Sequence, residues 1–184
     1  MPGRGVSGDR SPRLLVLRHG KSAWPADVPD GDRPLAPRGR RNAAEVGDRL
    51  FALGPLPDLV LCSPARRTRE TWELVAARWA VAPTAEYDGR LYGAQAGELA
   101  DVLRAVPAAA QTVLLIGHQP AVQELTSALA GSAVGDSLER VREKFPTCAL
   151  AVLELDGPWA QLAPGAALLR DFTTPRHHRD LPHG

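Results

Sequence analysis

Short apolar runs alternate with longer amphipathic segments along this chain of 184 residues. Residues 14–17, 59–62 and 113–116 are continuously apolar, and residues 148–155 form a further apolar stretch that contains one glutamate. Continuous apolarity, rather than alternation, indicates strands that are covered on both faces, as in a parallel sheet. We therefore predict three central strands at the first three runs and a fourth, nearer to an edge, at 148–155.

The segments between these runs carry apolar residues at every third or fourth position, which predicts helices. Ser63 and Pro64 predict the N-cap and first position of one of them, and Gly54-Pro55 and Gly131 predict the ends of two others. The predicted helices occupy residues 37–53, 63–79, 95–106, 120–131 and 136–144.

This alternation of strands and helices predicts an α/β fold, a three-layer α/β/α sandwich with a mostly parallel central sheet. No internal repeat or linker divides the chain. We expect a disordered arm at residues 1–12, a single domain at 13–174 and a flexible tail at 175–184.

Composition narrows the class of protein. The formal net charge of +1 argues against nucleic-acid binding, which usually requires a strongly basic face. No apolar run approaches the roughly 18 residues of a membrane helix, and the first residues lack the apolar core of a secretory signal. Cys62 and Cys148 lie inside apolar runs and read as buried free thiols. We expect a cytoplasmic protein without nucleic-acid or membrane partners.

Two of the five histidines, His19 and His118, each follow directly after a predicted strand. Ligands of open α/β sheets bind beyond the carboxyl ends of the strands, so these two are candidates for one shared pocket. The alternative is that each is a loop histidine bonded to nearby backbone. Arg18 favours the shared pocket, because a charge at the end of a buried strand is costly without a partner or ligand.

A third strand end adds cations. Arg66, Arg67 and Arg69 fall in the first turn of the predicted helix after residues 59–62. A helix N-terminus favours anions, so cations there are unfavourable unless an anion is bound nearby. We expect Arg66 and Arg69 to be solvated and at least one of the three arginines to face an anion. Histidines and arginines at three strand ends together predict a phosphate site.

No cofactor or metal is predicted at this site. The sequence shows no cluster of Asp, Glu and His at metal-ligand spacing, and it lacks the GxxxxGK[ST] loop of nucleoside triphosphate enzymes. A neutral imidazole is itself a nucleophile near pH 7, so a histidine in a cationic pocket can attack phosphorus directly.

The motifs that carry these residues resemble those of a known family. LLVLRHGKSAW resembles the RHG signature of the histidine phosphatase (phosphoglycerate-mutase-like) superfamily, SPARRTRET its second element and GHQP its third. The short chain and the segments VPDGDRPLAPRG, LYGAQAGEL and KFPTCALAVLEL resemble the SixA-type phosphohistidine phosphatases. The resemblance covers roughly residues 14–172.

The resemblance implies a role for each matching residue. His19 would be the nucleophile, Arg18 and Arg67 would hold the phosphoryl oxygens, and His118 would complete the clamp. Three further substrate-binding candidates follow the nucleophile. Gly20 would let the chain turn closely past the phosphate, and Lys21 and Ser22 would line the mouth of the pocket, although a solvated lysine is an equal alternative.

Two features depart from the wider superfamily. Mutase members usually carry Asn or Thr six residues after the nucleophile, where this chain has Pro25. Esterase members also carry a carboxylate that protonates the leaving oxygen. The candidates for a general acid here are Glu98 and Asp88, with Glu86 also nearby, and none matches the motif convincingly. Glu98 fits equally well as a first-turn helix carboxylate.

The missing acid favours cleavage of a P–N bond. An alkoxide needs a general acid to leave, whereas an imidazole needs much less help. The sequence thus predicts a metal-independent phosphatase that forms a phosphohistidine on His19, acts on phosphohistidine in proteins and releases inorganic phosphate. One alternative is a general phosphatase of small phosphate esters. Another, of a different class, is a non-catalytic phosphate or phosphohistidine sensor.

Overall fold

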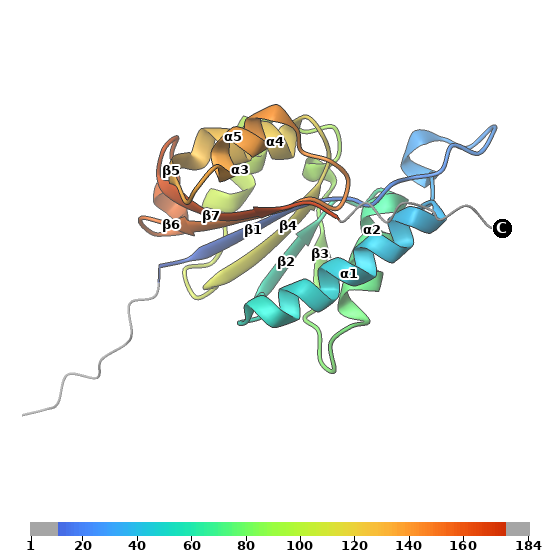
Figure 1. Cartoon of the computed structure of the whole chain (residues 1–184), viewed down its shortest axis with the longest axis horizontal. Coiled ribbons are helices and arrows are strands. Elements are labelled where there is room, and N and C mark those ends of the chain that lie inside the picture. The colour runs from blue at the N-terminus through green and yellow to red at the C-terminus, as the bar shows by residue number, and fades with distance from the viewer. Residues whose placement is uncertain (1–10, 176–184) are drawn as a thin grey trace, which may run out of the picture.

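The computed structural model of the chain describes residues 11–175. The predicted N-terminal arm, except Ser11 and Pro12, and the predicted tail after Pro175 therefore lie outside the described residues. The described chain folds around one mixed sheet, with helices on both of its faces (Figure 1).

Seven strands form this sheet, in the order β3-β2-β4-β1-β6-β7-β5. Their bounds are β1 Arg13–Arg18, β2 Leu59–Cys62, β3 Ala85–Tyr87, β4 Thr112–Gly117, β5 Ala130–Ala133, β6 Leu150–Leu155 and β7 Ala167–Thr173. β6 pairs antiparallel with both β1 and β7, and every other pairing is parallel. The sheet is therefore mostly parallel, as predicted, with one reversed strand.

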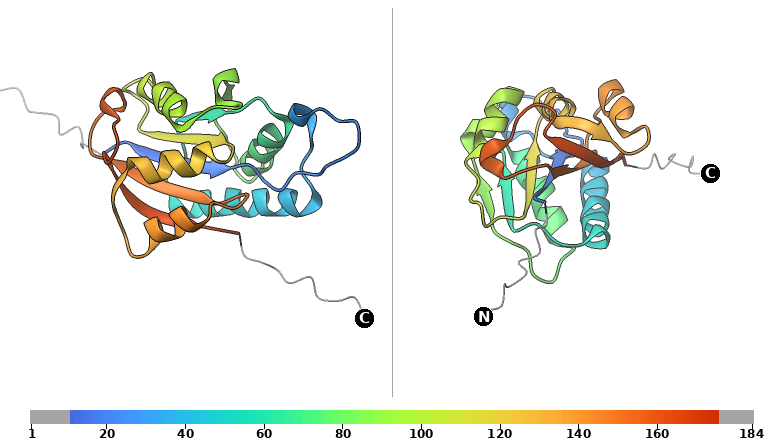
Figure 2. Two further views of the ribbon diagram at one scale, coloured as in Figure 1. Left: turned by 90° about the horizontal axis from the view of Figure 1, so that it is seen from above. Right: turned by 90° about the vertical axis from the view of Figure 1, so that its left-hand side faces the viewer.

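Five α-helices cover the sheet, and they form two separate layers (Figures 1 and 2). They are α1 Pro37–Leu53, α2 Arg66–Ala76, α3 Ala96–Arg104, α4 Ala121–Leu129 and α5 Ser137–Glu143. One apolar cluster joins α1 and α2 to one face of the sheet, and a larger one joins α3, α4 and α5 to the other. The predicted α/β class and three-layer sandwich are confirmed.

Strand β1 shows why its sequence is continuously apolar. Leu14 and Val16 pack into the cluster under α3, α4 and α5, whereas Leu15 and Leu17 pack into the cluster under α1 and α2. All four side chains are buried. A strand between two helical layers has no solvent face, so alternation of apolar and polar residues is absent.

Most of the predicted elements are found, with two local corrections. α1 has the predicted bounds, and Asp136 and Lys144 flank α5 as its caps. The predicted N-cap at Ser63 is wrong, because α2 begins at Arg66 with Ala65 as its N-cap. Leu53, whose apolar side chain fits the spacing of the predicted helix, is exposed at the last position of α1.

Helix α1 packs closely against the segment that leaves β1. A Cβ placed on Gly39 would lie 2.2 Å from the carbonyl oxygen of Lys21, a distance that no real side chain tolerates. The backbone N–H of Ala36 donates to that same carbonyl over 2.8 Å. Gly39 therefore fixes the path of the chain just after the predicted nucleophile.

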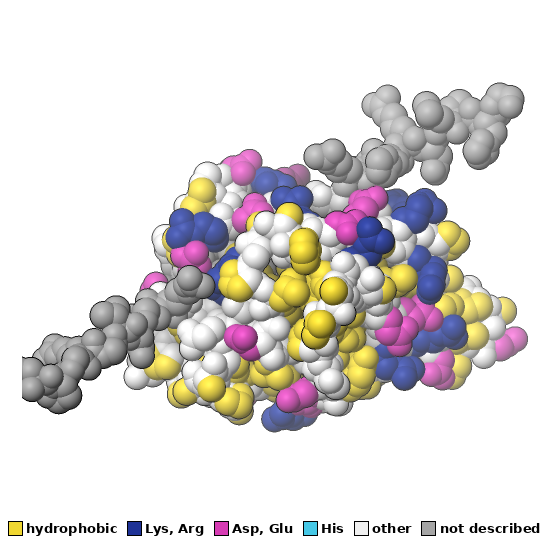
Figure 3. Space-filling model, turned by 90° about the horizontal axis from the view of Figure 1, so that it is seen from below, with side chains coloured by type: hydrophobic (Ala, Val, Ile, Leu, Met, Phe, Trp, Pro, Cys, Tyr) yellow, Lys and Arg dark blue, Asp and Glu magenta, His cyan; other side chains and the backbone are white. Residues whose placement is uncertain are grey.

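The remaining surface features are ordinary for a globular domain. Basic and acidic side chains are interspersed on the face shown in Figure 3. Surface ion pairs of the protein include Arg78 with Asp48. Cys62 and Cys148 are buried free thiols, as predicted. Among residues 11–175, no helix has the length and apolar character needed to cross a membrane.

Candidate active site

Three neighbouring strands end at one edge of the sheet and bring the predicted site residues together. β1 ends at Arg18, β2 at Cys62 and β4 at Gly117, and these strands are adjacent in the order β2-β4-β1. Arg18 pairs in register with Gly117, and Cys62 with Ile116. His19, Ser63 and His118 therefore follow directly at the same edge.

The geometry around His19 determines which ring nitrogen carries the proton. Nδ1 of His19 lies 2.7 Å from the carbonyl oxygen of Gly20. A carbonyl can only accept, so Nδ1 is protonated and Nε2 keeps its lone pair. The side chain is held in a buried position, with the residue only 8% exposed.

His19 is also kept neutral. Burial is the main cause that lowers the pKa of His19 to about 3. Electrostatic interactions with His118, Arg67 and Arg18 lower it further. The bond to Gly20 opposes this shift without reversing it. Near pH 7 the protein therefore presents an unprotonated Nε2 close to cationic side chains, as the predicted role of a nucleophile requires.

His118 lies directly beside His19, with 5.1 Å between the two ring centroids. Its Nε2 is 2.7 Å from Oγ of Ser63, and its buried Nδ1 has no partner among the described residues. Burial, followed by the charge of Arg67, lowers the pKa of His118 to about 4. If the Ser63 hydroxyl donates to Nε2, Nδ1 carries the hydrogen and can donate it to a phosphoryl oxygen.

Arg67 is the buried cation of the second motif. Its Nη1 donates to the backbone oxygen of Asp30 over 2.7 Å, and its Nη2 donates to Oδ2 of Asp30 over 3.1 Å. Arg66 and Arg69 are exposed, and Arg66 pairs with Glu70 on the same helix. Arg66 and Arg67 thus each face a carboxylate of the protein itself, and the contact of Arg67 with a bound phosphate stays a prediction.

Asp30 is the residue that the sequence prediction missed. The Tyr92 hydroxyl donates to its Oδ2 over 2.6 Å, and Arg33 donates to Oδ1 over 3.0 Å. These bonds and the Arg67 guanidinium hold the pKa of Asp30 well below its usual range. The ring of Tyr92 also lies against that of His118, with 5.6 Å between centroids. No motif signals this contact, because 37 residues separate Asp30 from Arg67.

Arg18 reaches the site from the end of β1. Its Nη1 donates to the backbone oxygen of Phe145 over 2.9 Å, and its buried Nε has no partner among residues 11–175. Burial lowers the pKa of Arg18, but an arginine remains charged. The charge of the Arg18 guanidinium lowers the pKa of both His19 and His118, so Arg18 interacts electrostatically with both rings.

The three residues after the nucleophile differ from one another. The Gly20 N–H donates to Oγ1 of Thr71, and a Cβ here would lie 2.9 Å from the carbonyl oxygen of Gly39. The backbone of Gly20 is not left-handed, so close packing against α1 accounts for this glycine, and its close passage along a phosphate stays a prediction. Lys21 is exposed, and it lines a cavity beside Arg18.

Ser22 does not line the mouth of the pocket as an open hydroxyl. It is buried, and its Oγ accepts a hydrogen bond of 2.5 Å from Nη2 of Arg33. Arg33 in turn binds Asp30, so Ser22 helps to hold the loop that carries Asp30 to Arg67. Ser22 thus contacts Arg67 only indirectly, through Arg33 and Asp30.

The two predicted candidates for a general acid are engaged elsewhere. Glu98 accepts from the backbone N–H of Gln95 over 2.7 Å and completes a capping box at the start of α3, which was the alternative interpretation. Asp88 binds Arg90 through both its oxygens, and this contact lowers the pKa of Asp88. A general acid must be protonated near pH 7, which the lowered pKa of Asp88 opposes.

The described residues also give no support for a bound metal. No group of three or more His, Cys, Asp or Glu side chains in residues 11–175 is placed to hold an ion. The side chains that the site offers are the neutral imidazole of His19, the imidazole of His118 beside it, and the guanidinium groups of Arg18 and Arg67, whose charges act on both rings.

Comparison with known proteins agrees with this chemistry. Residues 14–101 match the sequence model of the histidine phosphatase superfamily (branch 1). An uncharacterised protein of Mycobacterium tuberculosis is 43% identical over 162 residues, which are 87% of this chain and all of that protein. A candidate phosphohistidine phosphatase SixA from Nakamurella multipartitia has a similar structure, with a TM-score of 0.80 and 32% identity over 90% of this chain and 96% of that one.

A second solved structure, that of the protein histidine phosphatase SixA with tungstate, has a TM-score of 0.72 and 25% identity. The match covers 88% of this chain and 96% of that one. This chain therefore belongs to the histidine phosphatase superfamily, and it is a phosphatase. Within that superfamily it is of the SixA type.

Proposed function

We propose that this phosphatase removes the phosphoryl group from phosphohistidine in proteins, through a covalent phosphohistidine on His19. One observation carries the proposal: His19 is buried, neutral and bonded through Nδ1, so that Nε2 is free to attack. The SixA relatives support the choice of substrate, because one is a candidate phosphohistidine phosphatase and another is a protein histidine phosphatase.

The first step transfers the phosphoryl group to the enzyme. Nε2 of His19 attacks phosphorus in line, a new N–P bond forms, and the P–N bond of the substrate breaks. The bonding pair returns to the substrate imidazole, which leaves as a neutral ring when its other nitrogen already carries a proton. Arg18, Arg67 and His118 hold the three equatorial oxygens, and this positioning supplies most of the rate.

The second step returns the enzyme to its starting state. Water attacks the phosphorus on His19, the N–P bond breaks, and the proton of water passes to the departing phosphate. His19 is again neutral, with Nδ1 still bonded to Gly20. The products are inorganic phosphate and the unmodified protein histidine.

The surroundings of the site favour this leaving group over an alkoxide. Glu98 is used as a helix cap and Asp88 is held by Arg90. Asp30 is the carboxylate that contacts Arg67, and its lowered pKa keeps it ionised. An ionised carboxylate cannot protonate a leaving alkoxide, whereas imidazole needs little such help.

We also propose that the protein acts in the cytoplasm, where it would meet histidine-phosphorylated proteins.

The test is a paired turnover assay without added metal. The purified protein is given a phosphohistidine peptide and, separately, an unactivated alkyl phosphate, with His19→Ala as the control. We expect fast release of phosphate from the peptide alone, and an acid-labile phosphoenzyme that His19→Ala does not form. Equal cleavage of both substrates would establish a general ester phosphatase instead. Phosphate binding without His19-dependent turnover of either would establish a sensor.

A further inference from the structure

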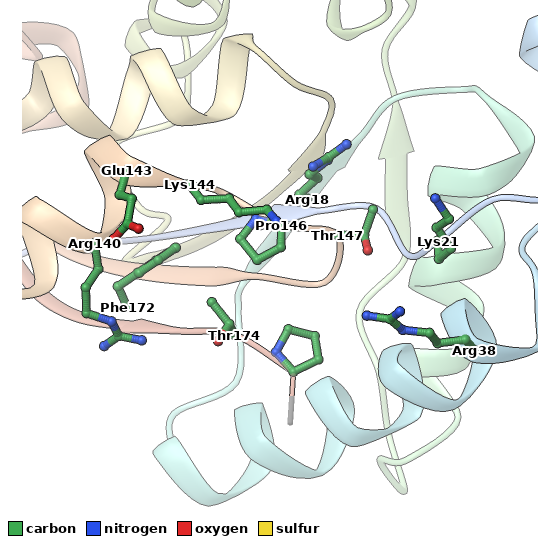
Figure 4. A pocket seen from close by; sticks show the side chains of 11 residues that line it. Arg18, Lys21, Arg38, Arg140, Glu143, Lys144, Pro146, Thr147, Phe172 and Thr174 are labelled. Carbon is green, nitrogen blue, oxygen red and sulfur yellow. The ribbon is translucent and has the colours of Figure 1, made fainter. Parts of the chain in front are cut away.

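A cavity of about 450 Å³ opens next to the site, on the other side of Arg18 (Figure 4). Its walls come from three parts of the chain: the residues just after β1, the start of α1, and the segment from α5 through the turn before β6 to the end of β7. None of the steps proposed above uses this space. Arg18 is the one residue that belongs both to the cavity and to the phosphate clamp.

The charge of this cavity has one dominant sign. Five of its lining residues are cations, and a single carboxylate, Glu143, is among the others. The cations are Arg18, Lys21, Arg38, Arg140 and Lys144. Lys21 and Lys144 form no ion pair within residues 11–175, and the pairing of Arg140 with Asp136 is long, at 4.0 Å. The chain as a whole is nearly neutral, so this concentration of positive charge is local.

The cations are spread along the cavity rather than gathered at one point. Figure 4 shows Arg140 and Lys144 on one side and Lys21 and Arg38 on the other, with Thr147 between them. The apolar surfaces of Phe172 and Pro146 also line the space. A second phosphate of a small substrate would need cations that converge on one position. Separated cations with apolar surface between them suit an extended acidic chain.

An exposed aromatic side chain in the loop that follows Lys21 favours a macromolecular partner as well. Trp24 stands three residues after Lys21, and its side chain is 76% exposed. The guanidinium of Arg33 stacks on its ring, 3.1 Å from the centroid, so that the indole is held in place while exposed. Aromatic side chains of this kind are common anchors in protein interfaces.

We infer that this cavity docks an acidic segment of the phosphoprotein substrate, with Asp or Glu side chains beside the phosphohistidine. Their carboxylates pair with Lys144, Lys21 and Arg38 while the phosphoryl group reaches Arg18 and His19. The inference rests on the proposed function and names the class of substrate that the site selects. It predicts a phosphatase that distinguishes its substrates by the charge of the neighbouring sequence.

The decisive comparison uses two phosphohistidine peptides of equal length, one with Asp and Glu around the phosphohistidine and one with Gln and Ser. The variants are Lys144→Glu and Arg38→Glu. Arg142→Glu is the matched control, because Arg142 is an exposed residue of α5 that does not line the cavity, and its replacement makes the same change of charge. An acidic residue in the first turn of α1 agrees with the helix dipole, so Arg38→Glu should fold.

We expect the wild-type protein to prefer the acidic peptide, mainly through a lower KM. Lys144→Glu and Arg38→Glu should each raise the KM for the acidic peptide by about fivefold, the size of effect expected for the loss of one exposed ion pair. The double variant should raise this KM by more than tenfold. The neutral peptide and the control should show no such change, and added salt should weaken the preference. Equal KM values for the two peptides with the wild type, or an equal loss with Arg142→Glu, would overturn the inference.

A binding measurement separates this inference from the proposed function. A dye-labelled peptide rich in Asp and Glu, without phosphohistidine, is titrated with the wild type and with the double variant in a fluorescence anisotropy assay. We expect binding to the wild type that the double variant loses and Arg142→Glu keeps. That result would support the docking cavity even if phosphohistidine peptides were not hydrolysed. No binding to the wild type would count against the cavity whatever the chemistry at His19.

Discussion

Each of the two histidine rings is hydrogen-bonded at one nitrogen by a single neighbour. Gly20 fixes the hydrogen of His19 on Nδ1, and Ser63 meets His118 at Nε2. A carbonyl leaves no choice of tautomer, but a hydroxyl can either donate or accept. The orientation of the Ser63 hydroxyl therefore decides whether Nδ1 of His118 can donate to the phosphoryl group.

Replacing Ser63 tests this assignment. Ser63→Ala should lower kcat/KM by about tenfold, the usual cost of one buried hydrogen bond. The tautomer of His118, followed by ¹⁵N NMR, should become mixed. Ser137→Ala removes a buried hydroxyl on α5 and serves as the control. An unchanged tautomer with an unchanged rate would show that Ser63 only packs against the ring.

The contact between Asp30 and Arg67 competes with the substrate. A phosphoryl group that binds Arg67 must displace the carboxylate or share the guanidinium with it. Asp30→Asn should therefore tighten the binding of inorganic phosphate by about two- to fivefold, a modest gain because the Asp30 side chain is 53% exposed. Isothermal titration with phosphate measures the change.

Asp32→Asn is the control for this experiment, since Asp32 lies in the same short 3₁₀ turn, is exposed and forms no ion pair within the described part of the chain. Weaker phosphate binding by Asp30→Asn would mean that the carboxylate orients Arg67 for the substrate and does not compete with it.

The sequence reveals only part of this site. Arg18, His19 and His118 were predictable because each follows an apolar strand directly, and parallel strands end at one edge. Asp30 and Tyr92 were not, because they reach Arg67 from loops whose path depends on packing. Ser63 was misread as a helix cap, since its hydroxyl is used by His118 rather than by α2.

Among the helices and strands, those with a regular apolar pattern and clear end signals could be predicted from the sequence, and those without could not. α1 was predictable to the residue because Pro37 and Gly54 mark its ends. β3 has three residues, two of them exposed, and β5 is also largely exposed, so neither has an apolar signature. β7 has three apolar residues followed by Arg170 and Asp171, so it shows neither a continuous apolar run nor a regular alternation, and its conformation depends on pairing with β6 and β5.

The contact of α1 with the chain after β1 gives a sharp test. In an open helix, Gly→Ala stabilises by up to about 1 kcal/mol. Gly39→Ala should instead destabilise the fold by about 2 kcal/mol or more, because the new Cβ meets the Lys21 backbone. The same shift should also lower activity, since it moves the segment that follows His19.

Gly97→Ala is the matched control, because Gly97 lies in α3 and a Cβ there meets nothing within 4 Å. It should leave activity unchanged and slightly raise the free energy of unfolding, measured in urea. If Gly39→Ala were as stable and active as Gly97→Ala, the close packing of α1 against Lys21 would be disproved.

For the whole molecule, the two buried histidines make stability depend on pH. Their folded pKa values, about 3 for His19 and about 4 for His118, lie below the value near 6.5 expected after unfolding. The unfolded chain therefore binds more protons as the pH falls below 6.5. The stabilising contribution is complete above this pH and is lost progressively as the pH falls, to about 4 for His118 and to about 3 for His19.

We expect the free energy of unfolding to fall by on the order of 1 kcal/mol per histidine for each pH unit between 6 and 5. Urea unfolding at pH 7.5, 6.0 and 5.0 measures it. His118→Gln should reduce this slope by about half, while Asp30, whose pKa is already low, should not affect it in this range. A flat profile between pH 7.5 and 5.0 would show that the histidines titrate normally in the folded protein.

The reversal of β6 has a consequence for how such a phosphatase can diversify. Because β6 runs against its neighbours, its first residues, and not its last, meet the catalytic edge of the sheet. The turn before it is hydrogen-bonded to Arg18 and His19 through its main-chain atoms, which are the carbonyls of Phe145 and Ala149 and the N–H of Cys148. Every amino acid supplies such a carbonyl, and every one except proline supplies such an N–H. The side chains at 144 and 147 can therefore be exchanged without disturbing the nucleophile, so that new substrate preferences can evolve, or be engineered, on an unchanged hydrolytic centre.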